Sequence, residues 1–376
     1  MSSAKPSLDL LRSLTDEHVL RALMGRRRLT RAEIAVLTGI SKPTISESVR
    51  RLEDAGVVVD TGERSSGRGR AGSYYTLSPT CGAALVVSIT PQGVVAEAVD
   101  AFGLVTRTAE EPLVRGADAG RAERAVTKAV TRVASADPVV RLRTAAVSAA
   151  DPVDRATGRL VHLPDSPFLV GDLDPAALLA EAVDGTVLVD NDVNWAARAE
   201  QAARGATEGS RDFVYLYLDE GLGCAVVADG EVRRGHSGLA GEIAHLVTTG
   251  PGGRAMRLTD VFAELGLRRA GSTAIDVDRA RSADGGTIES LAVAVSGVLA
   301  AAVALSDPEV VVVGGGWGRD AAVLEELSRS TAALPRPVPI VAPAISEQPQ
   351  LVGARAAALQ QLRDVIVAGA REPSSQ

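Results

Sequence analysis

Residues 213–246 read FVYLYLDEGLGCAVVADGEVRRGHSGLAGEIAHL, and this stretch carries the strongest indication of fold and function in the chain. An apolar strand pattern runs into the glycine turn at 221–223, and the stretch closes on a second glycine-containing segment, 238–245. Glycine lets a backbone approach a ligand closely. Glu242 and His245 lie three residues apart, and on a helix this spacing would put the carboxylate and the imidazole on one face.

The composition is that of a globular protein. The chain has 376 residues, of which 46% are hydrophobic and 23% charged, and this length suffices for two or three domains with cores of their own. We find no charged-then-apolar leader and no apolar run of about 18 residues, so we expect neither secretion nor membrane insertion. Two cysteines, Cys81 and Cys224, fit a reducing cytoplasm. We therefore predict a cytoplasmic protein.

The charge is distributed unevenly. Residues 1–80 carry 13 basic and 9 acidic residues, a net charge of +4, whereas the remainder carries 27 basic and 38 acidic residues, a net charge of −11. A basic head on an acidic body indicates that the head meets a polyanion. Chance imbalance is the alternative.

Three helices are predicted in the head, at 7–25, 30–39 and 42–55, from the spacing of their apolar residues. Thr30 and Glu33 have the spacing of a capping box at the start of the second helix. A glycine turn separates the second helix from the third. Two short helices joined in this way are typical of a helix-turn-helix unit.

The third helix has the composition of a recognition helix. Ile45, Val49 and Leu52 share its inner face. Hydroxyls and a cation near its start suit base edges, and arginines further on suit phosphates. The residues predicted to contact DNA are Lys42, Thr44, Ser46, Arg50 and Arg51. An ordinary solvated helix face is the alternative.

A wing is predicted directly after this helix. Two short strands, at 57–60 and 74–77, flank a loop rich in glycine, serine and arginine. Arginines at the tip of such a hairpin suit phosphates or a narrow minor groove. The arginines predicted to contact DNA from the wing are Arg64, Arg68 and Arg70.

From Cys81 onward, apolar strand patterns alternate with alanine-rich helical patterns, which is typical of layered α/β structure. Strands are predicted at 83–89, 94–100, 143–148, 187–189, 213–218, 225–228 and 310–313. Helices are predicted at about 117–136, 174–184, 192–204, 286–305, 319–333 and 353–370.

The stretch 213–246 resembles the signature of the ROK family, whose members are sugar kinases and sugar-responsive repressors. The resemblance covers about residues 81–370 and implies an actin-like, sugar-kinase fold in which two lobes face a cleft. We therefore expect an N-terminal winged helix-turn-helix domain at 1–80, a first lobe at 81–200 and a second at 201–376. The C-terminal helix would either stay with the second lobe or pack back on the first.

The resemblance also implies the residues of an effector site. Asn191 and Asp192 resemble the family segment in which the asparagine binds the sugar and the aspartate accepts a proton from a sugar hydroxyl. Glu242 and His245 match the family's sugar-contacting pair. The loop 163–167 lies where the family offers an asparagine to the sugar, so either Asp165 or Ser166 would take its place. The alternatives are that Asp192 only caps a helix and that His245 is a structural histidine.

Two departures from the family oppose catalysis and metal binding. The family's phosphate turn reads D-x-G-G-T, but here Ser88 replaces the carboxylate and Pro91 removes a backbone donor. Phosphates need convergent N–H groups and a metal, so we predict no kinase activity, no cofactor and, for Asp192, only a vestigial base. The 40 residues after His245 contain no cysteine, so the family's zinc site is not expected.

These features together favour a sugar-responsive transcriptional regulator, a repressor that is not an enzyme. Its expected partners are double-stranded operator DNA, a sugar or sugar derivative and further copies of itself in a homodimer or higher oligomer, with no membrane. Two alternatives remain at this stage. One is a ROK sugar kinase with an added DNA-binding head; the other is a DNA-binding dimer without an effector.

Overall fold

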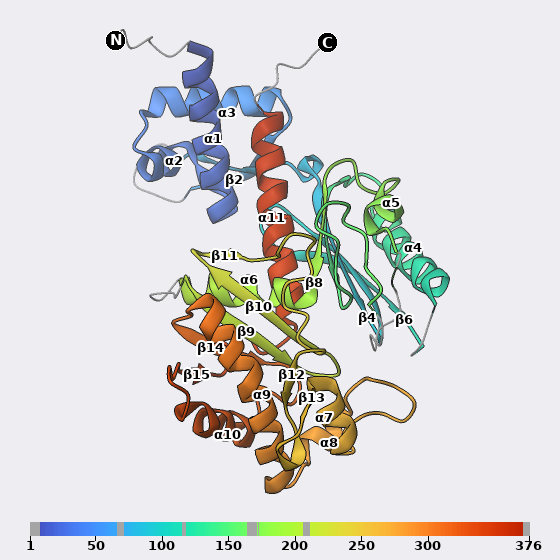
Figure 1. The fold of residues 1–376 in the computed structure, drawn as a ribbon. Helices are drawn as coiled ribbons and strands as arrows, with labels where there is room; N and C mark the ends of the chain where they lie inside the picture. The colour runs from blue at the N-terminus through green and yellow to red at the C-terminus, as the bar shows by residue number, and fades with distance from the viewer. Residues whose placement is uncertain are drawn as a thin grey trace.

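The structure is a computed structural model that describes residues 8–65, 71–114, 118–163, 171, 173–205 and 211–370. Figure 1 shows a small N-terminal head above two sheet-containing lobes, with the long C-terminal helix α11 (Pro349–Gly369) running from the head down between them. This is the two-lobe, actin-like body with a winged helix-turn-helix head that the sequence predicted.

The head combines three helices with a small sheet. The helices are α1 (Leu8–Arg26), α2 (Arg31–Thr38) and α3 (Lys42–Asp54). The sheet has the order β1-β3-β2, and its strands are β1 (Leu29–Thr30), β2 (Val58–Arg64) and β3 (Ser73–Leu77). The capping box of Thr30 and Glu33 is present at the start of α2, and Ile45, Val49 and Leu52 are buried as predicted.

The first lobe is a five-stranded mixed sheet of order β6-β5-β4-β7-β8. Its strands are β4 (Ala83–Thr90), β5 (Gly93–Val99), β6 (Val105–Pro112), β7 (Leu142–Ala149) and β8 (Val187–Asn191). The alternation of side chains along β4 sends Leu85 and Val87 into a core with α4 (Ala119–Ser135), and Ala84 and Val86 into a core with α11. The sheet is therefore covered on both faces.

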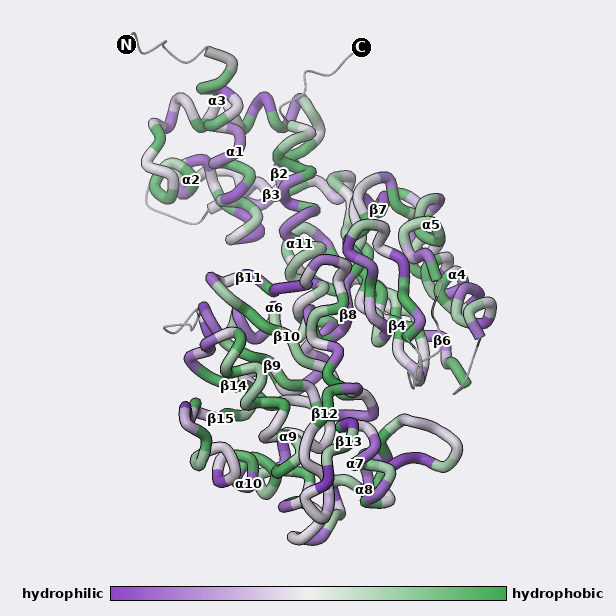
Figure 2. Tube along the Cα trace, viewed as in Figure 1, coloured by the Kyte–Doolittle hydropathy of each residue, from purple (hydrophilic) through white to green (hydrophobic). Residues whose placement is uncertain are grey.

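The second lobe has a sheet of order β11-β10-β9-β14-β15, in which β9 and β14 run parallel. Its strands are β9 (Phe213–Leu218), β10 (Leu222–Ala228), β11 (Glu231–Val232), β14 (Val310–Gly314) and β15 (Ile340–Val341). Helix α6 (Asp192–Gly205) packs on one face, and α9 (Gly285–Ser306) and α10 (Ala321–Ala332) pack on the other. In Figure 2 much of β9, β14 and α11 is coloured as hydrophobic.

Several short strands and helices were not predicted from the sequence, and one helix is shorter than predicted. Besides β1, β6, β11 and β15, the unpredicted strands and α-helices are the ribbon of β12 (Val247–Thr249) and β13 (Ala255–Arg257), and helices α7 (Leu258–Glu264) and α8 (Val277–Arg281). The helix predicted at 174–184 is only α5 (Pro175–Leu179). Two- and three-residue strands carry too little periodicity to be recognised in sequence.

Helix α9 has the length and the composition of a membrane-crossing helix, and no other helix in the described ranges does. Of its most apolar window, 39% is buried, and in the structure it packs on β9, β10, β12, α7 and α10. An apolar helix that covers a sheet in a globular protein can have the same length and composition, so we draw no conclusion about a membrane from α9.

Candidate ligand cavity and nucleic-acid interface

A cavity of about 220 Å³ lies where the two lobes meet. The first lobe contributes the β4–β5 turn and the junction of β8 with α6, and the second lobe contributes the β9–β10 turn and the loop 238–245. Four of the five predicted effector residues line this cavity: Asn191, Asp192, Glu242 and His245. The fifth, Asp165, lies outside the described residues.

Asn191 fixes the start of α6 beside the cavity. Its Oδ1 accepts a hydrogen bond of 2.9 Å from the backbone N–H of Val193, and its Nδ2 donates to the carbonyls of Ala149 (3.4 Å) and Asp151 (3.2 Å). Asn191 thus provides the side-chain bond to the first turn of α6 and ties that turn to the end of β7. The carboxylate of the neighbouring Asp192 lies at the wall of the cavity.

Two of the acidic residues that line the cavity, Asp192 and Glu242, are desolvated. The pKa of Asp192 is raised to about 7, mainly by burial and to a smaller extent by the negative charges of Glu242 and Asp219. Burial likewise raises the pKa of Glu242 to about 7. Desolvation disfavours the charged form of a carboxyl group. Near neutral pH, each side chain is therefore able to donate as well as accept hydrogen bonds.

Close backbone packing positions Glu242. Gly241 has φ of +100°, and a Cβ at this position would overlap the carbonyl oxygen of Cys224 in β10. The Cys224 N–H in turn donates to the Gly241 carbonyl at 3.0 Å. Residues 238–246 form turns, so the helical arrangement considered for Glu242 and His245 is wrong. Positive-φ glycines 238 and 241 break the helix, and the pair still lines one cavity.

Replacing Gly241 by alanine should therefore disturb both stability and ligand binding. A non-glycine residue in this backbone region costs about 1–3 kcal/mol before any overlap with Cys224 is counted. We expect a lower free energy of unfolding and loss of ligand affinity, measured by chemical denaturation and calorimetry. Gly205→Ala, where a Cβ would meet nothing within 4 Å, is the control. Equal stability of the two variants would contradict the role assigned to Gly241.

The β9–β10 turn carries its own negative charges. The Asp219 carboxylate accepts the backbone N–H groups of Gly316 and Glu220, both at 2.8 Å, and the hydroxyl of Tyr217 at 3.1 Å. Glu220 pairs with Arg269 at 2.8 Å. The backbone N–H groups of Gly316 and Glu220, which could otherwise bind an anion, are therefore already hydrogen-bonded to Asp219.

Sequence reasoning missed two cavity residues. Gln92, in the β4–β5 turn, donates to Glu220 at 3.2 Å and so bridges the two lobes. Gln350, in the first turn of α11, also lines the cavity. Gln92 follows Pro91 in the altered phosphate turn and Gln350 lies in a segment without a motif, and only the fold brings both to the cavity. Ser88 is buried in β4 and does not line the cavity, whereas Pro91 does.

The described residues hold no group of three or more His, Cys, Asp or Glu side chains that could bind a metal. His245 is half-buried at the cavity, and His236 is exposed away from it.

The predicted DNA-contacting side chains of α3 differ in their exposure and in their contacts with the rest of the head. Lys42, Thr44 and Arg50 are exposed and Ser46 is half-buried. The Arg51 guanidinium, in contrast, pairs with the buried carboxylate of Asp16 in α1 at 2.7 Å. The Ser48 hydroxyl donates to the same carboxylate.

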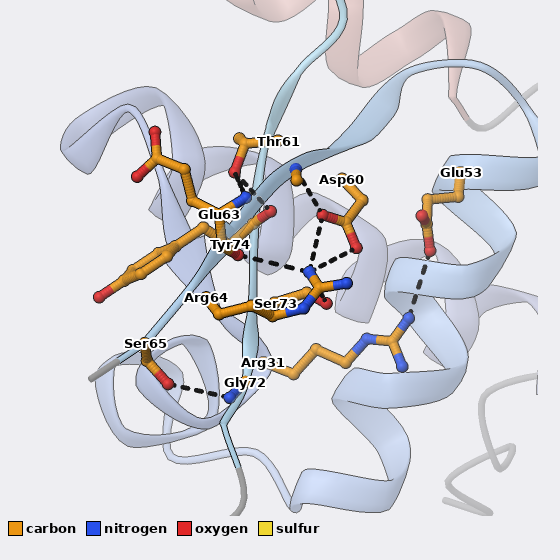
Figure 3. A network of polar contacts seen from close by, with 11 residues as sticks. Arg31, Glu53, Asp60, Thr61, Glu63, Arg64, Ser65, Gly72, Ser73 and Tyr74 are labelled. Carbon is orange, nitrogen blue, oxygen red and sulfur yellow. Dashed lines mark hydrogen bonds and ion pairs between the residues drawn. The ribbon is translucent and has the colours of Figure 1, made fainter. Parts of the chain in front are cut away.

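The wing is built from β2 and β3. Ser65 and Gly72 close it, since the Ser65 N–H donates to the Gly72 carbonyl and the Gly72 N–H donates to the Ser65 hydroxyl, each at 2.9 Å. Figure 3 shows Arg64 held by Asp60 (3.3 Å) and Ser73 (2.7 Å). The other two predicted arginines, at positions 68 and 70, lie outside the described residues.

These contacts predict different effects for two neighbouring arginines. Arg51→Ala would leave the Asp16 carboxylate without its ion pair, so we expect the free energy of unfolding to fall by about 1–3 kcal/mol. Arg50→Ala removes an exposed side chain and should change it by less than about 0.5 kcal/mol while weakening DNA binding and its salt dependence. Denaturation and binding titrations at several salt concentrations test both. Equal loss of stability would contradict the assignment.

Comparison with known proteins agrees with this architecture. Residues 12–59 match the winged helix-turn-helix DNA-binding family, and residues 121–259 match the ROK family. The bifunctional enzyme NanE/NanK of Brucella suis is 30% identical over 58% of this chain and 43% of its own length. The xylose repressor of Bacillus spizizenii is 20% identical over 63% of this chain and 61% of its own length. The chain thus spans about half the length of these curated relatives.

A solved structure supports the fold across both parts. The ROK family transcriptional regulator described as a homologue of the Escherichia coli MLC protein superposes with a TM-score of 0.65, at 17% identity, over 96% of this chain and 99% of its own. The chain is thus similar to the ROK family over residues 121–259 and to winged helix-turn-helix domains over residues 12–59. Its relatives include both an enzyme and repressors.

Proposed function

We propose that this chain is a sugar-responsive, DNA-binding transcriptional repressor. The observation that carries the proposal is the presence, in one ROK chain, of a winged head with an exposed helix start and of a polar cavity between the lobes. The fold alone would not distinguish a regulator from a kinase. The head would bind DNA, and the cavity would bind a small molecule.

The DNA-binding half of the proposal rests on α3 and the wing. Lys42, Thr44 and Ser46 lie at the N-terminal end of α3, from which recognition helices reach base edges in the major groove. Arg50 and the wing arginines are proposed to contact phosphates. A single head neutralises few phosphates, so we propose that a homodimer reads two half-sites in the cytoplasm.

The ligand half rests on the charges of the cavity. Among its described lining residues are four carboxylates, those of Asp192, Asp219, Glu220 and Glu242, and no lysine or arginine. Residues 164–170, which follow lining residue Leu163, also contain neither. Although Glu220 is paired with Arg269, a phosphate or carboxylate would meet negative charge with no lysine or arginine in the described lining, whereas sugar hydroxyls would meet both donors and acceptors. We therefore propose an uncharged sugar as the effector.

We further propose that the cavity does not transfer phosphate. Asp219 already binds the Gly316 N–H, and its charge together with that of Glu220 opposes a polyphosphate. One observation favours the rival kinase: Asp192 lies at the cavity with a pKa near 7, which suits a general base. A coupled assay with ATP and D-glucose, D-xylose or N-acetylmannosamine should show no turnover. Turnover that disappears in Asp192→Asn would establish the kinase instead.

The central test uses the full chain. A duplex is first selected from random DNA by the unliganded protein, and its affinity is measured by fluorescence anisotropy with and without D-glucose and D-xylose. We expect a duplex that depends on the head, bound at least tenfold more weakly by residues 81–376, and a change in affinity with at least one sugar. Binding by residues 81–376 alone that equals binding by the full chain would refute the assignment of the head.

A further inference from the structure

Helix α11 extends from the cavity to the head. Its first turn supplies Gln350 to the cavity wall, and the side-chain amide of Gln350 has no hydrogen-bond partner among the described residues. At about 1.5 Å per residue, the 21 residues of α11 span roughly 30 Å. Figure 1 shows its other end beside α1 of the head.

Near the cavity, α11 contacts α6 backbone to backbone. A Cβ on Gly353 would overlap the carbonyl oxygen of Trp195 in α6, so no side-chain layer separates the two helices at this point. Trp195 is itself fixed, since its indole N–H donates to the Val147 carbonyl at 2.9 Å. Because α6 begins at Asp192, a shift of the cavity wall at Asp192 meets α11 directly. Close-packed interiors transmit such shifts.

About two turns from its start, α11 is tied to the first lobe. Arg355 and the buried Glu97 of β5 form a bidentate pair at 2.6 and 2.7 Å. Two-bond pairs of this kind fix orientation as well as distance. Helix α11 is therefore fixed to β5 at this point.

At its far end, α11 shares one hydrophobic core with the head. Leu362 and Ile366 belong to the same buried cluster as Leu20 and Leu23 of α1. Arg363 adds polar contacts, because its Nε donates to the Ala101 carbonyl at 3.1 Å and its Nη2 to the Met24 carbonyl at 3.4 Å. The head is thus packed on α11 and not only joined to the body by the chain.

Helix α1 completes the connection to the recognition helix. Asp16 of α1 accepts hydrogen bonds from Ser48 and Arg51 of α3. Arg21 of α1 lies 3.7 Å from Asp364 of α11. A contact path therefore runs from the cavity through α6 or Gln350 to α11, and from there through α1 to α3.

We propose that α11 is the element that couples the cavity to the DNA-binding head, with Gln350 as its ligand-facing side chain. Ligand bound between Asp192 and Gln350 changes the packing of α6 on α11, and α11 carries this change to α1 and α3, a shear between packed helices. The involvement of a sugar and of DNA rests on the proposed function. The packing connection from α6 through α11 to α1 does not depend on that function.

The first test therefore uses neither sugar nor DNA. Gly353→Ala separates α11 from α6, and hydrogen–deuterium exchange of the full chain reports on each segment. We expect at least threefold faster exchange in α1, far from the substitution. Gly205→Ala, at the open end of α6, is the matched control and should leave α1 unchanged. Exchange that changes only in α6 and residues 349–360 would overturn the proposal.

A second variant keeps the proposal testable if Gly353→Ala does not fold. Arg363→Ala with Asp364→Ala removes polar contacts between α11 and the head and leaves the cavity intact. In the unmodified chain, D-glucose or D-xylose should slow exchange both in 238–246 and in α1, whereas in this variant only 238–246 should respond. An α1 response equal to that of the unmodified chain would overturn the proposal. The matched control is Arg329→Ala on α10.

The outcomes also separate this proposal from the proposed function. If neither sugar protects 238–246 in the unmodified chain, a response to these sugars is refuted, and the Gly353→Ala comparison alone decides the coupling. If the sugars protect 238–246 and change DNA affinity while Gln350→Ala behaves as the unmodified chain, the regulator stands and the role of Gln350 is wrong. We expect Gln350→Ala to weaken sugar binding at least fivefold.

Discussion

Replacing Asp192 or Glu242 by alanine is expected to abolish the effect of sugar on DNA binding and to leave the affinity of the unliganded chain for DNA nearly unchanged. Both carboxyl groups line the cavity, and neither lies in the head. A sugar hydroxyl left without its partner in a desolvated site costs about 1–3 kcal/mol, and more where the partner is charged. Each substitution should therefore weaken sugar binding by about tenfold or more.

This expectation is measured by titrating the selected duplex with each variant, with and without D-glucose and D-xylose. Glu231→Ala is the control, because Glu231 is exposed in β11 and does not line the cavity. Calorimetric titration of the sugar alone separates loss of binding from loss of coupling. A variant that still responds to sugar as the unmodified chain does would place the effector site elsewhere.

Local patterns account for what the sequence could predict. The capping box of Thr30 and Glu33 spans one helical turn, and the inward face of α3 follows from spacings of three and four residues. Most strands of the two lobe sheets follow from short apolar runs between turns, although β6, β11 and β15 do not. In these segments the residues that interact are neighbours in sequence, so the pattern is visible before the fold is known.

The contacts that sequence could not indicate join distant segments. Arg51 has the position of a phosphate contact, but its partner Asp16 lies 35 residues away in another helix. Gln92 and Glu220 meet across 128 residues. Periodicity describes which face of an element is buried and not which element covers it, so such pairs require the tertiary structure.

The pattern around Glu242 illustrates a third case. A spacing of three residues suits a helix, but Gly238 and Gly241 have positive φ, and the segment forms turns instead. The glycines that first indicated a ligand site also exclude the helix. The two side chains reach the same cavity through backbone contact with β10, for which the spacing is irrelevant.

Replacing Asp192 by asparagine is expected to stabilise the unliganded protein at neutral pH. The folded state raises the pKa of Asp192 from 3.8 to about 7, mainly because burial disfavours the charge. Between about pH 4 and 7 the folded chain therefore keeps a proton that the unfolded chain has released, and stability falls as the pH rises through this window. Asparagine binds no proton and removes this loss.

The size of the effect follows from the pKa difference, which corresponds to on the order of 4 kcal/mol when fully expressed. Water in the cavity reduces it, so we expect about 1–3 kcal/mol in favour of Asp192→Asn at pH 8 and little difference near pH 4. Denaturant titrations across this range measure the difference, with Asp278→Asn, at an exposed position, as the control.

Glu242→Gln should act in the same direction, because burial raises the pKa of Glu242 to about 7 as well. The charge of Glu242 also raises the pKa of Asp192, so the double variant should gain less than the two single variants together. Such a site gives up stability to keep carboxyl groups available for a ligand, as functional sites commonly do. An Asp192→Asn variant no more stable than the unmodified chain at pH 8 would mean that the Asp192 carboxyl group is solvated in the unmodified chain. The cavity would then lack the desolvated carboxyl groups on which the proposed recognition of sugar hydroxyls depends.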